Sequence, residues 1–452
     1  MEPLLIDAAN RATRYLESLE TRRVSPSPSS LDRLGELNYP LQDQPIEAAK
    51  VLEELDSIGS PATVASAGGR FFGFVIGGSL PPALAANILA GAWDQNAGLE
   101  ISSPINAALE KICRDWLISS FGLPGEAEVG FVTGATMANF AALAAARHAL
   151  LQMQGWDVEA KGLFGAPPIT VIVGNEVHVS VLKALSMLGL GRERVQRVPA
   201  DGQGRLIPEQ MPLIDGPTIV CIQAGNVNTG AFDPADEVCS RLQGTGAWVH
   251  VDGAFGLWAA VSPTRRYLVG GVERADSWAT DAHKWLNVPY DSGLVFVRDK
   301  AHLNAAMSAS AAYLIAGETR DPHLFVPEMS RRARAVEIWA ALRSLGRDGL
   351  ANVIDRSCDC ARHMAEAIQD AGYRVLNEVV LNQVLVSFGS PQTTRRVIAG
   401  IQQDGTCWCG GTEWQGQTAM RISVSSRATT DRDIDKSLEA ILRIAAEAKS
   451  PA

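Results

Sequence analysis

The sequence predicts an α/β protein whose large domain is built on a mostly parallel sheet. Two observations predict this class. From about residue 71 onward, short apolar runs alternate with helical patterns, as they do in parallel α/β sheets. Several of these runs end in small, hydroxyl or charged residues, and such sheets bind ligands at the carboxyl ends of their strands. The strand ends therefore hold the residues that indicate function.

Residues 1–75 are predicted to form a helical arm. Residues 6–21 have helical spacing, and a linker rich in proline and serine follows at residues 24–28. Further short amphipathic helices are predicted within residues 31–55. The arm has few apolar runs long enough to form a core, so we expect it to lie across another surface, such as a second subunit.

Residues 76–345 are predicted to form the large domain. Helices are predicted between its strands, for example at residues 135–151 and 179–188. The clearest strands are predicted at residues 129–132, 169–173, 218–222, 248–251 and 294–297.

Residues 346–452 are predicted to form a smaller C-terminal α/β domain, which a helix at residues 330–345 leads into. Strands are expected at residues 384–388 and 420–424. Thr430 and Asp433 have the spacing of a capping box, which predicts that the final helix begins there.

Composition indicates a small-molecule partner. The chain has a formal net charge of −10 and no run of lysines or arginines, so nucleic acid or an anionic membrane would be repelled. The longest apolar stretch, residues 80–93, is too short to span a bilayer, and the N-terminus shows no signal peptide, which together predict a cytoplasmic protein. The cysteines are expected to be reduced, and no metal site is predicted, because the paired cysteines lack zinc-type spacing.

Lys284, in the stretch at residues 275–285, is the centre of the candidate site. A lysine that acts as a covalent catalyst must be partly neutral near neutral pH, so it needs surroundings that disfavour its ammonium form or a carbonyl to which it can bond. The apolar neighbours Trp285 and Leu286 are expected to provide such surroundings. The alternative is a solvated surface lysine, which is the commoner case.

Three other strand ends carry candidate residues. Gly134, Ala135 and Thr136 lie where a strand meets a helix and suit a phosphate, with ordinary helix capping as the alternative. His178 suits stacking on an aromatic cofactor and proton transfer, although a histidine there is more often a satisfied polar residue. Asp252 ends a buried strand, where either a protonated pyridine nitrogen or the next helix would use its charge.

These motifs together resemble the fold type I pyridoxal 5′-phosphate enzymes, and most nearly the group II amino-acid decarboxylases, which include the aromatic-amino-acid and glutamate enzymes. The motifs are Gly-Ala-Thr at residues 134–136, His178, His-Val-Asp at residues 250–252 and His-Lys at residues 283–284. The resemblance covers most of the chain. It implies a large domain like that of aspartate aminotransferase, and a homodimer with its active site at the subunit interface.

The resemblance also implies a role for each candidate residue. Lys284 would form the internal aldimine, Asp252 would pair with the pyridinium nitrogen, and His178 would stack on the ring. Tyr313 would return a proton to the substrate, as the tyrosine of a mobile catalytic loop does in family decarboxylases. The residues expected to complete the cofactor site are Gly134, Ala135, Thr136, Asn226, Ala254, Asp281 and His283, with Ser277 or Thr280 as a further phosphate contact.

Four departures from the family pattern concern the cofactor and the substrate face. Residues 225–227 are Gly-Asn-Val where the family usually has Gly-Thr-Thr, and Ala135 replaces the second glycine of a common phosphate turn. Gly253 stands where alanine is usual, and Ala282 where proline is usual. These differences bear on the hydrogen bonding of the cofactor's ring hydroxyl and on the shape of the substrate face.

The implied reaction is decarboxylation of an L-amino acid to its amine. An aldolase, a carbon–sulfur lyase or an aminotransferase on the same fold is the first alternative, and a non-catalytic relative is a remote one. A dehydrogenase is disfavoured, because the motif at residues 189–191 lacks its third glycine and follows a helix. The residues expected at the substrate pocket suit either an aromatic side chain (Phe71, Phe72, Phe74 and Trp93) or a polar one (Arg70, Asn96 and Glu100).

Overall fold

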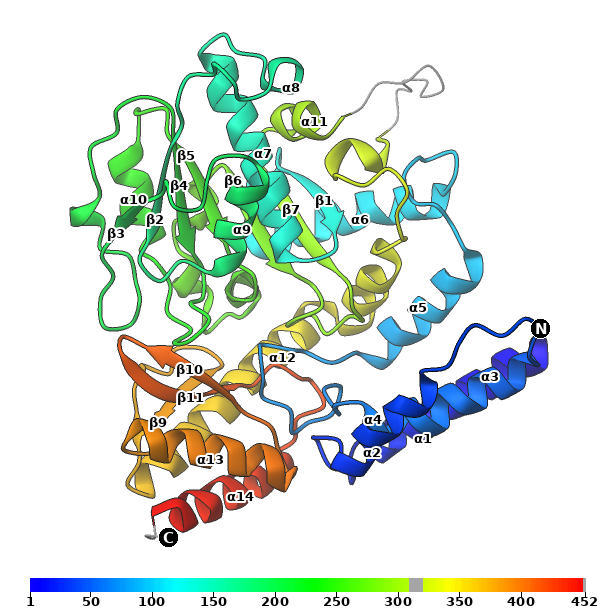
Figure 1. Cartoon of the computed structure of the whole chain (residues 1–452). Coiled ribbons are helices and arrows are strands. Elements are labelled where there is room, and N and C mark those ends of the chain that lie inside the picture. The colour runs from blue at the N-terminus through cyan, green and yellow to red at the C-terminus, as the bar shows by residue number, and fades with distance from the viewer. Residues whose placement is uncertain (309–319, 450–452) are drawn as a thin grey trace. The chain divides into compact units, whose positions relative to one another are not determined.

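The computed structural model describes residues 1–308 and 320–449 (Figure 1). The chain forms two compact units. The large unit contains residues 79–359 and 377–383, and the small unit contains residues 1–78, 360–376 and 384–452. Tyr313, the expected proton donor, lies outside the described residues.

A seven-stranded sheet with the order β1-β7-β6-β5-β4-β2-β3 forms the large unit. β7 is antiparallel to its neighbours β1 and β6, and the other neighbouring pairs are parallel. The predicted α/β class with a mostly parallel sheet is therefore confirmed. The strands are β1 (Glu128–Val132), β2 (Thr170–Gly174), β3 (Gln196–Val198), β4 (Thr218–Gln223), β5 (Trp248–Asp252), β6 (Ser277–Asp281) and β7 (Gly293–Val297).

The strand directions bring several strand ends to one edge of the sheet. β1 runs parallel to β6 because β7, between them, is antiparallel to both. The carboxyl ends of β1, β6, β5, β4 and β2 therefore meet at the same edge, and β7 begins there, with Gly293 paired to both Val132 and Asp281. In sheets of this kind that edge binds the ligand.

Apolar side chains explain why most of these segments form buried strands. β1, β4, β5 and β7 are buried along their whole length, as the apolar runs predict. β6 is also buried throughout but contains Ser277, Thr280 and Asp281, so it is not among the clear apolar runs. Its polar side chains are accommodated because each accepts or donates a hydrogen bond within the large unit.

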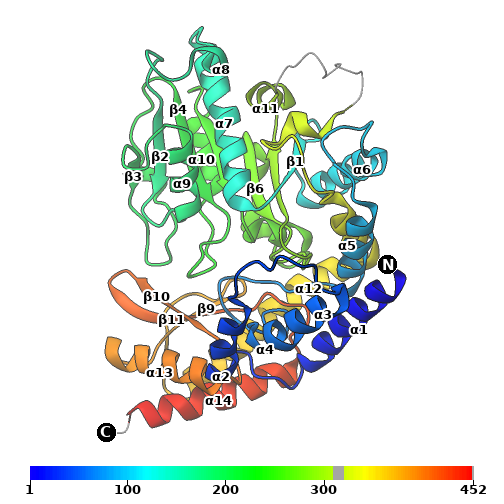
Figure 2. The same cartoon turned by 45° about the vertical axis from the view of Figure 1, so that its right-hand side comes forward.

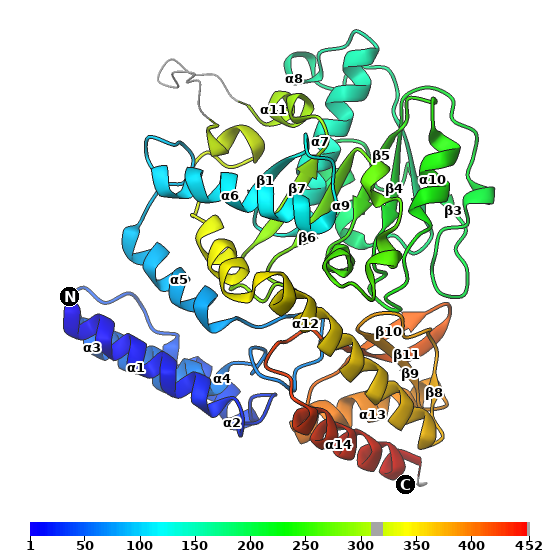
Figure 3. The same ribbon diagram turned by 180° about the vertical axis from the view of Figure 1, so that it is seen from behind.

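Helices cover both faces of the large sheet. α7 (Ala135–Met153), α9 (Val179–Met187) and α11 (Lys300–Met307) lie on one face, and α6 (Pro104–Phe121) and α10 (Ala235–Leu242) lie on the other (Figures 1 and 3). α7 is rich in alanine, which favours helix formation and allows close packing. The remaining helices are α5 (Pro81–Trp93), α8 (Val158–Lys161), η3 (Pro208–Gln210), η4 (Gly256–Val261), η5 (Arg266–Val269), η6 (Val272–Arg274) and η7 (Pro322–Phe325).

The small unit holds a four-stranded sheet of order β10-β11-β9-β8, with α13 and α14 on one side of it (Figure 2). Backbone hydrogen bonds from Phe72 to Trp408 (2.9 Å) and from Ser423 to Phe72 (2.9 Å) attach the end of the N-terminal arm to this unit. Its elements are α1 (Glu2–Ser18), α2 (Pro28–Asp32), η1 (Arg33–Leu37), α3 (Ala48–Glu54), η2 (Leu55–Gly59), α4 (Ser60–Ala62), β8 (Arg374–Val375), β9 (Gln383–Ser387), α13 (Pro391–Asp404), β10 (Gly410–Trp414), β11 (Gln417–Ser423) and α14 (Asp431–Lys449).

α12 (Ala335–Asp370) belongs to both units. It begins later than residue 330, where the sequence predicts its start, and Arg331 in the preceding segment forms a buried ion pair with Glu110 (2.7 Å). Gly346 interrupts the helix with φ 61° and ψ −174°. The predicted capping box of α14 is confirmed, since Thr430 N donates to Asp433 (3.0 Å) and Asp433 N donates to Thr430 Oγ1 (3.2 Å).

No helix in the described part of the chain is long and apolar enough to cross a membrane. The seven cysteines are buried, and none of them forms a disulfide. Within the described residues, no group of three or more His, Cys, Asp or Glu side chains is arranged to hold a metal ion.

Candidate active site

The carboxyl edge of the large sheet brings together most of the residues singled out from the sequence. Gly134 follows β1, Asn226 follows β4, and His178 follows β2. Asp252 is the last residue of β5, and Asp281 is the last residue of β6. All of them lie in the large unit.

Lys284 is ion-paired at this edge. Its Nζ lies 2.8 Å from Asp281 Oδ2, and its side chain is 18% exposed. Trp285 and Leu286, the apolar neighbours expected from the sequence, are buried, but the carboxylate of Asp281 is the partner that Lys284 contacts. The amine must therefore leave Asp281 before it can act as a nucleophile.

Gly134, Ala135 and Thr136 form a tight turn into α7. A Cβ on Gly134 would lie 3.1 Å from His283 Cε1 and 3.3 Å from Asp281 Oδ1, so only glycine leaves this space open. The Ala135 N–H donates to Asp281 Oδ1 (2.5 Å), which shows that this helix start attracts an anion. The hydroxyl of Thr136 makes no hydrogen bond within the described residues, so it can bind a phosphate oxygen.

His283 is held as a hydrogen-bond donor towards this turn. Its Nδ1 accepts the Ser292 N–H (3.1 Å), and its ring lies 4.2 Å from that of Tyr290, centroid to centroid. Burial lowers the pKa of His283, so the imidazole is neutral at neutral pH and Nε2 carries the proton. That N–H faces Asp281 Oδ1 at 3.6 Å.

Asp252 is buried and accepts hydrogen bonds on both carboxylate oxygens. Oδ1 accepts the Ala254 N–H (3.2 Å), and Oδ2 accepts from Asn139 Nδ2 (3.2 Å). The Ser180 hydroxyl lies 3.5 Å from Oδ2. A buried carboxylate that accepts several N–H groups suits a cationic partner such as a pyridinium nitrogen.

His178 caps α9 and is fixed by Ser180. Its Nδ1 lies 2.7 Å from Ser180 Oγ and accepts the Ser180 N–H (3.2 Å). The same serine hydroxyl approaches Asp252, so His178 and Asp252 share one hydrogen-bonding partner.

Sequence reasoning did not identify Ser180, Asn139 or the role of His250. Asn139 Oδ1 accepts from His250 Nε2 (2.8 Å), while its Nδ2 donates to Asp252. Asn139 falls on α7 at a helical spacing from Ala135, and His250 lies two residues before Asp252 on the same strand face. Those two spacings are the signals that point to both residues. Ser277, expected at the phosphate, donates instead to His250 Nδ1 (2.9 Å) at the other end of β6.

Pyridoxal 5′-phosphate fits the residues present. Among the described residues, Asn226 Nδ2 is buried and finds no hydrogen-bond partner. Its Oδ1 accepts the N–H groups of Asn228 (2.9 Å) and Thr229 (3.2 Å), and these bonds fix the orientation of the amide. An unpaired buried donor is costly unless a ligand supplies an acceptor, and the cofactor's ring oxygen is such an acceptor. The turn at Gly134, with its open space and its anion-binding N–H, suits the phosphate.

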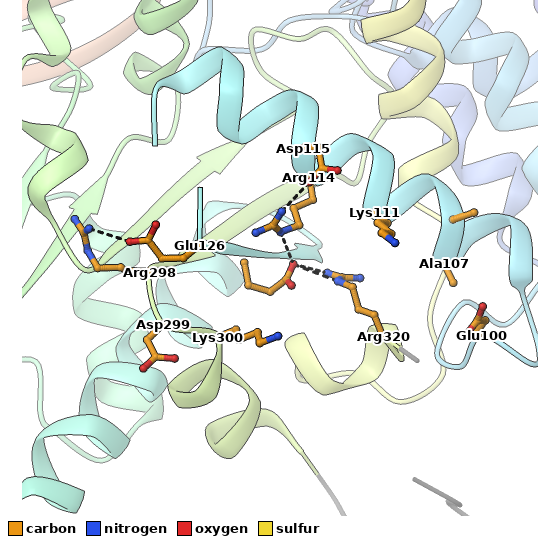
Figure 4. Close-up of a pocket in the computed structure, with 12 residues that line it drawn as sticks. Glu100, Ala107, Lys111, Arg114, Asp115, Glu126, Arg298, Asp299, Lys300 and Arg320 are labelled. Carbon is orange, nitrogen blue, oxygen red and sulfur yellow. Dashed lines mark hydrogen bonds and ion pairs between the residues drawn. The ribbon is translucent and has the colours of Figure 1, made fainter. Parts of the chain in front are cut away.

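A separate hollow of about 1070 Å³ lies at the opposite end of β1 (Figure 4). Glu128, the first residue of β1, lies 3.1 Å from Arg320 and 3.5 Å from Arg114. Arg298 pairs with Glu126 (3.5 Å). Glu100, expected at the substrate pocket, lines this hollow. The three arginines that line the hollow are therefore each paired with a neighbouring carboxylate.

Comparison with known proteins identifies the class to which this site belongs. Residues 28–389 match the pyridoxal-dependent decarboxylase conserved domain. The chain belongs to the pyridoxal-dependent decarboxylase family, and pyridoxal 5′-phosphate is its cofactor.

Several curated relatives are similar to this chain. Acidic amino acid decarboxylase GADL1 of Mus musculus is 31% identical over 68% of this chain and 58% of its own length. Cysteine sulfinic acid decarboxylase of Mus musculus is 29% identical over 80% of this chain and 75% of its own length. Aromatic-L-amino-acid decarboxylase of Bacillus atrophaeus is 28% identical over 76% of this chain and 73% of its own length. The chain spans 58% to 61% of the length of the mammalian GADL1 relatives.

Two solved structures show how far the fold is shared. Mouse CSAD has a TM-score of 0.90 at 25% identity, with 98% of both chains covered. Oryza sativa TDC, solved with PLP and tryptamine, has a TM-score of 0.91 at 23% identity, with 99% of this chain and 97% of that chain covered. The second similarity demonstrates a common fold.

Proposed function

We propose that this protein decarboxylates an L-amino acid to its amine with pyridoxal 5′-phosphate. One observation carries the proposal: Lys284, Asp252 and the turn at Gly134 share one edge of the sheet in a chain of a pyridoxal-dependent decarboxylase family. The bound cofactor supplies a sink for the electron pair that remains when carbon dioxide leaves.

The surroundings of each residue support a task. Lys284, once released from Asp281, would bond to the cofactor's aldehyde. Asp252, already fixed by N–H donors on both oxygens, would keep the proton on the ring nitrogen. The turn at Gly134 and the Nε2–H of His283 would hold the phosphate.

Proton return to the substrate is proposed for Tyr313. His178 would lie against the ring, and its fixed Nδ1 contact with Ser180 sets the ring's orientation. Asn226 would donate its Nδ2–H, which finds no partner among the described residues, to the cofactor's ring oxygen in place of the family's threonine hydroxyl.

The substrate we propose is an aromatic amino acid. Arg70, one of the three candidates for binding a polar side chain, is only 3% exposed and donates to the backbone carbonyls of Glu20 (3.1 Å) and Arg22 (2.9 Å). Phe72 is part of the core, whereas Phe74 is 62% exposed. Phe74 has a φ of 55° and Val75 a φ of 63°, and such strain in non-glycine residues is concentrated at functional sites.

We propose that the protein is a homodimer in the cytoplasm. α5 buries only Ala83 and Ala86 and leaves Ile88, Leu89 and Trp93 exposed, which is the composition of a surface that another subunit covers. The free, buried cysteines fit a reducing compartment.

Carbon dioxide release from a panel of L-amino acids, with pyridoxal phosphate present, tests the proposal. The panel spans aromatic, acidic, basic and small side chains. We expect release from the aromatic members, no release with Lys284→Ala, and unchanged release with Lys183→Ala, which removes an exposed lysine of α9. Release from the acidic members alone would refute the aromatic assignment. Bound cofactor without release from any amino acid would replace decarboxylation by an aldolase, lyase or aminotransferase reaction.

A further inference from the structure

Behind Asp252, four polar side chains form a buried row. Trp248 and His250 come from β5, Ser277 begins β6, and Asn139 comes from α7. His250, Ser277 and Asn139 are 0% exposed. Each contact along the row lies between 2.8 and 3.2 Å. The row ends at the one carboxylate that would face the cofactor's ring nitrogen.

The chemistry of the four side chains gives the row a single direction. Trp248 Nε1 can only donate, and it donates to Ser277 Oγ (2.8 Å). At the other end, Asn139 must turn its N–H group to Asp252, because its carbonyl oxygen would be repelled by the carboxylate. Asn139 Oδ1 then accepts from His250, which requires a proton on His250 Nε2.

His250 joins the two halves of the row. A neutral imidazole with its proton on Nε2 has a lone pair on Nδ1, and that lone pair accepts the Ser277 hydroxyl proton (2.9 Å). Burial lowers the pKa of His250 to about 4, so the ring is neutral at neutral pH. Every donor from Trp248 to Asn139 therefore points towards Asp252, and aligned hydrogen bonds polarise one another.

We propose that Asn139 and His250 are positioning residues, which hold the Asp252 carboxylate in the one orientation that pairs with a protonated ring nitrogen. Asn139 acts directly on Oδ2, and His250 acts through Asn139. The proposal rests on the cofactor site and is independent of the substrate class. It predicts that substitution of Asn139 or His250 lowers the affinity only for a cofactor whose ring carries a nitrogen.

The test compares two ligands in equilibrium binding to the apoprotein. One is pyridoxal phosphate, and the other is its 1-deaza analogue, in which a C–H group replaces the ring nitrogen. We expect Asn139→Leu to weaken pyridoxal phosphate binding roughly 30-fold, because a hydrogen bond to a buried charge is lost, and to weaken binding of the analogue less than about threefold. Asp252→Asn serves as the positive control, because it should likewise weaken the binding of pyridoxal phosphate more than the binding of the analogue.

Paired variants of His250 keep the test usable if Asn139→Leu fails to fold. The amide N–H of a glutamine can replace the Nε2–H of the imidazole, so His250→Gln should bind pyridoxal phosphate within about threefold of the unmodified protein. His250→Leu should weaken the binding of pyridoxal phosphate roughly tenfold and should not weaken the binding of the 1-deaza analogue. Equal weakening of both ligands, or no weakening of either, would overturn the proposal. Because no turnover is measured, these outcomes are distinct from a failure to release carbon dioxide.

Discussion

The carboxylate of Asp281 organises the residues around Lys284. It accepts the Ala135 N–H (2.5 Å), pairs with Lys284 Nζ (2.8 Å) and faces His283 Nε2 (3.6 Å). A negative group thus already lies at the start of α7, where the cofactor phosphate is proposed to bind. Asp281 and the phosphate would compete for the same N–H group, so cofactor binding should require that this carboxylate shift towards Lys284 or be displaced.

Gly134→Ala tests the phosphate turn. The added methyl group would lie 3.1 Å from His283 Cε1, so it should narrow the turn and weaken pyridoxal phosphate binding by at least about tenfold, as measured by titration of the apoprotein. Gly125→Ala is the matched control, because a Cβ there meets nothing within 4 Å. If both variants bound pyridoxal phosphate with equal affinity, the phosphate would not bind at this turn.

His250→Gln should change the pH dependence of stability. The folded pKa of His250 is about 4, below its ordinary value of 6.5, so the unfolded chain binds the extra proton as the pH falls from 6.5 towards 4. The unmodified protein should therefore lose about 2 kcal/mol of unfolding free energy between pH 7.5 and pH 5 from this group, and the variant should not. Asp233, whose pKa burial raises to about 6, contributes with the opposite sign in both proteins and cancels in the difference.

Urea unfolding of the two proteins at several pH values measures this difference. Parallel stability curves for the unmodified protein and His250→Gln would show that His250 is not a buried neutral imidazole.

At the scale of secondary-structure elements, a buried charge cluster joins α6 to the segment before α12. Arg331 and Glu110 are 0% and 1% exposed at their side chains and lie 2.7 Å apart, and Arg320 also contacts Glu110 (2.9 Å). Arg331 Nη2 also donates to the carbonyl of Phe131 in β1 (2.8 Å). These contacts explain why residues 330–334 do not extend the helix.

Arg331→Met should lower the free energy of unfolding by on the order of 3 kcal/mol, because it removes one partner of a buried carboxylate and of a buried carbonyl. Denaturant unfolding gives the value. Arg395→Met, which breaks the exposed pair with Glu413 (3.2 Å), is the control and should cost less than about 1 kcal/mol. Similar losses in the two variants would mean that burial does not matter at this cluster.

Strands with apolar sequences were predictable, and a polar one was not. β1, β2, β4, β5 and β7 each lie within two residues of a predicted run, because burial selects apolar side chains there. β6 is equally buried, but hydrogen bonds to Ala254, His250 and other distant residues satisfy its polar side chains. Partners far away in the sequence leave no periodic pattern, so local reasoning cannot detect them.

The same limit applies, at the scale of the whole molecule, to the candidate active site. Strand ends singled out Gly134, His178 and Asp252 as candidates, and the structure brings them to one edge because the parallel strands end there. The ion pair of Lys284 with Asp281 and the row behind Asp252 depend on packing between α7, β5 and β6, and no spacing within one element specifies them.

Subunit association is the prediction for the assembled protein. Ile88 and Leu89 on α5 are 60% and 53% exposed, so burial against a second copy would remove apolar surface from water. We expect the unmodified protein to have the mass of a dimer in light scattering, and Ile88→Asp with Leu89→Asp to shift it to a monomer. Met153→Asp, at an apolar residue of α7 that is 64% exposed, is the control. A monomeric unmodified protein would contradict the proposed assembly.

The most direct test of the central claim is to find which residue carries the cofactor. The protein is loaded with pyridoxal phosphate, reduced with borohydride to make the bond permanent, and digested for mass spectrometry. The peptide with Lys284 should carry the pyridoxyl group in the unmodified protein, and no peptide should carry it in Lys284→Ala. Labelling of a different lysine, or the same labelling in both proteins, would contradict a site built around Lys284.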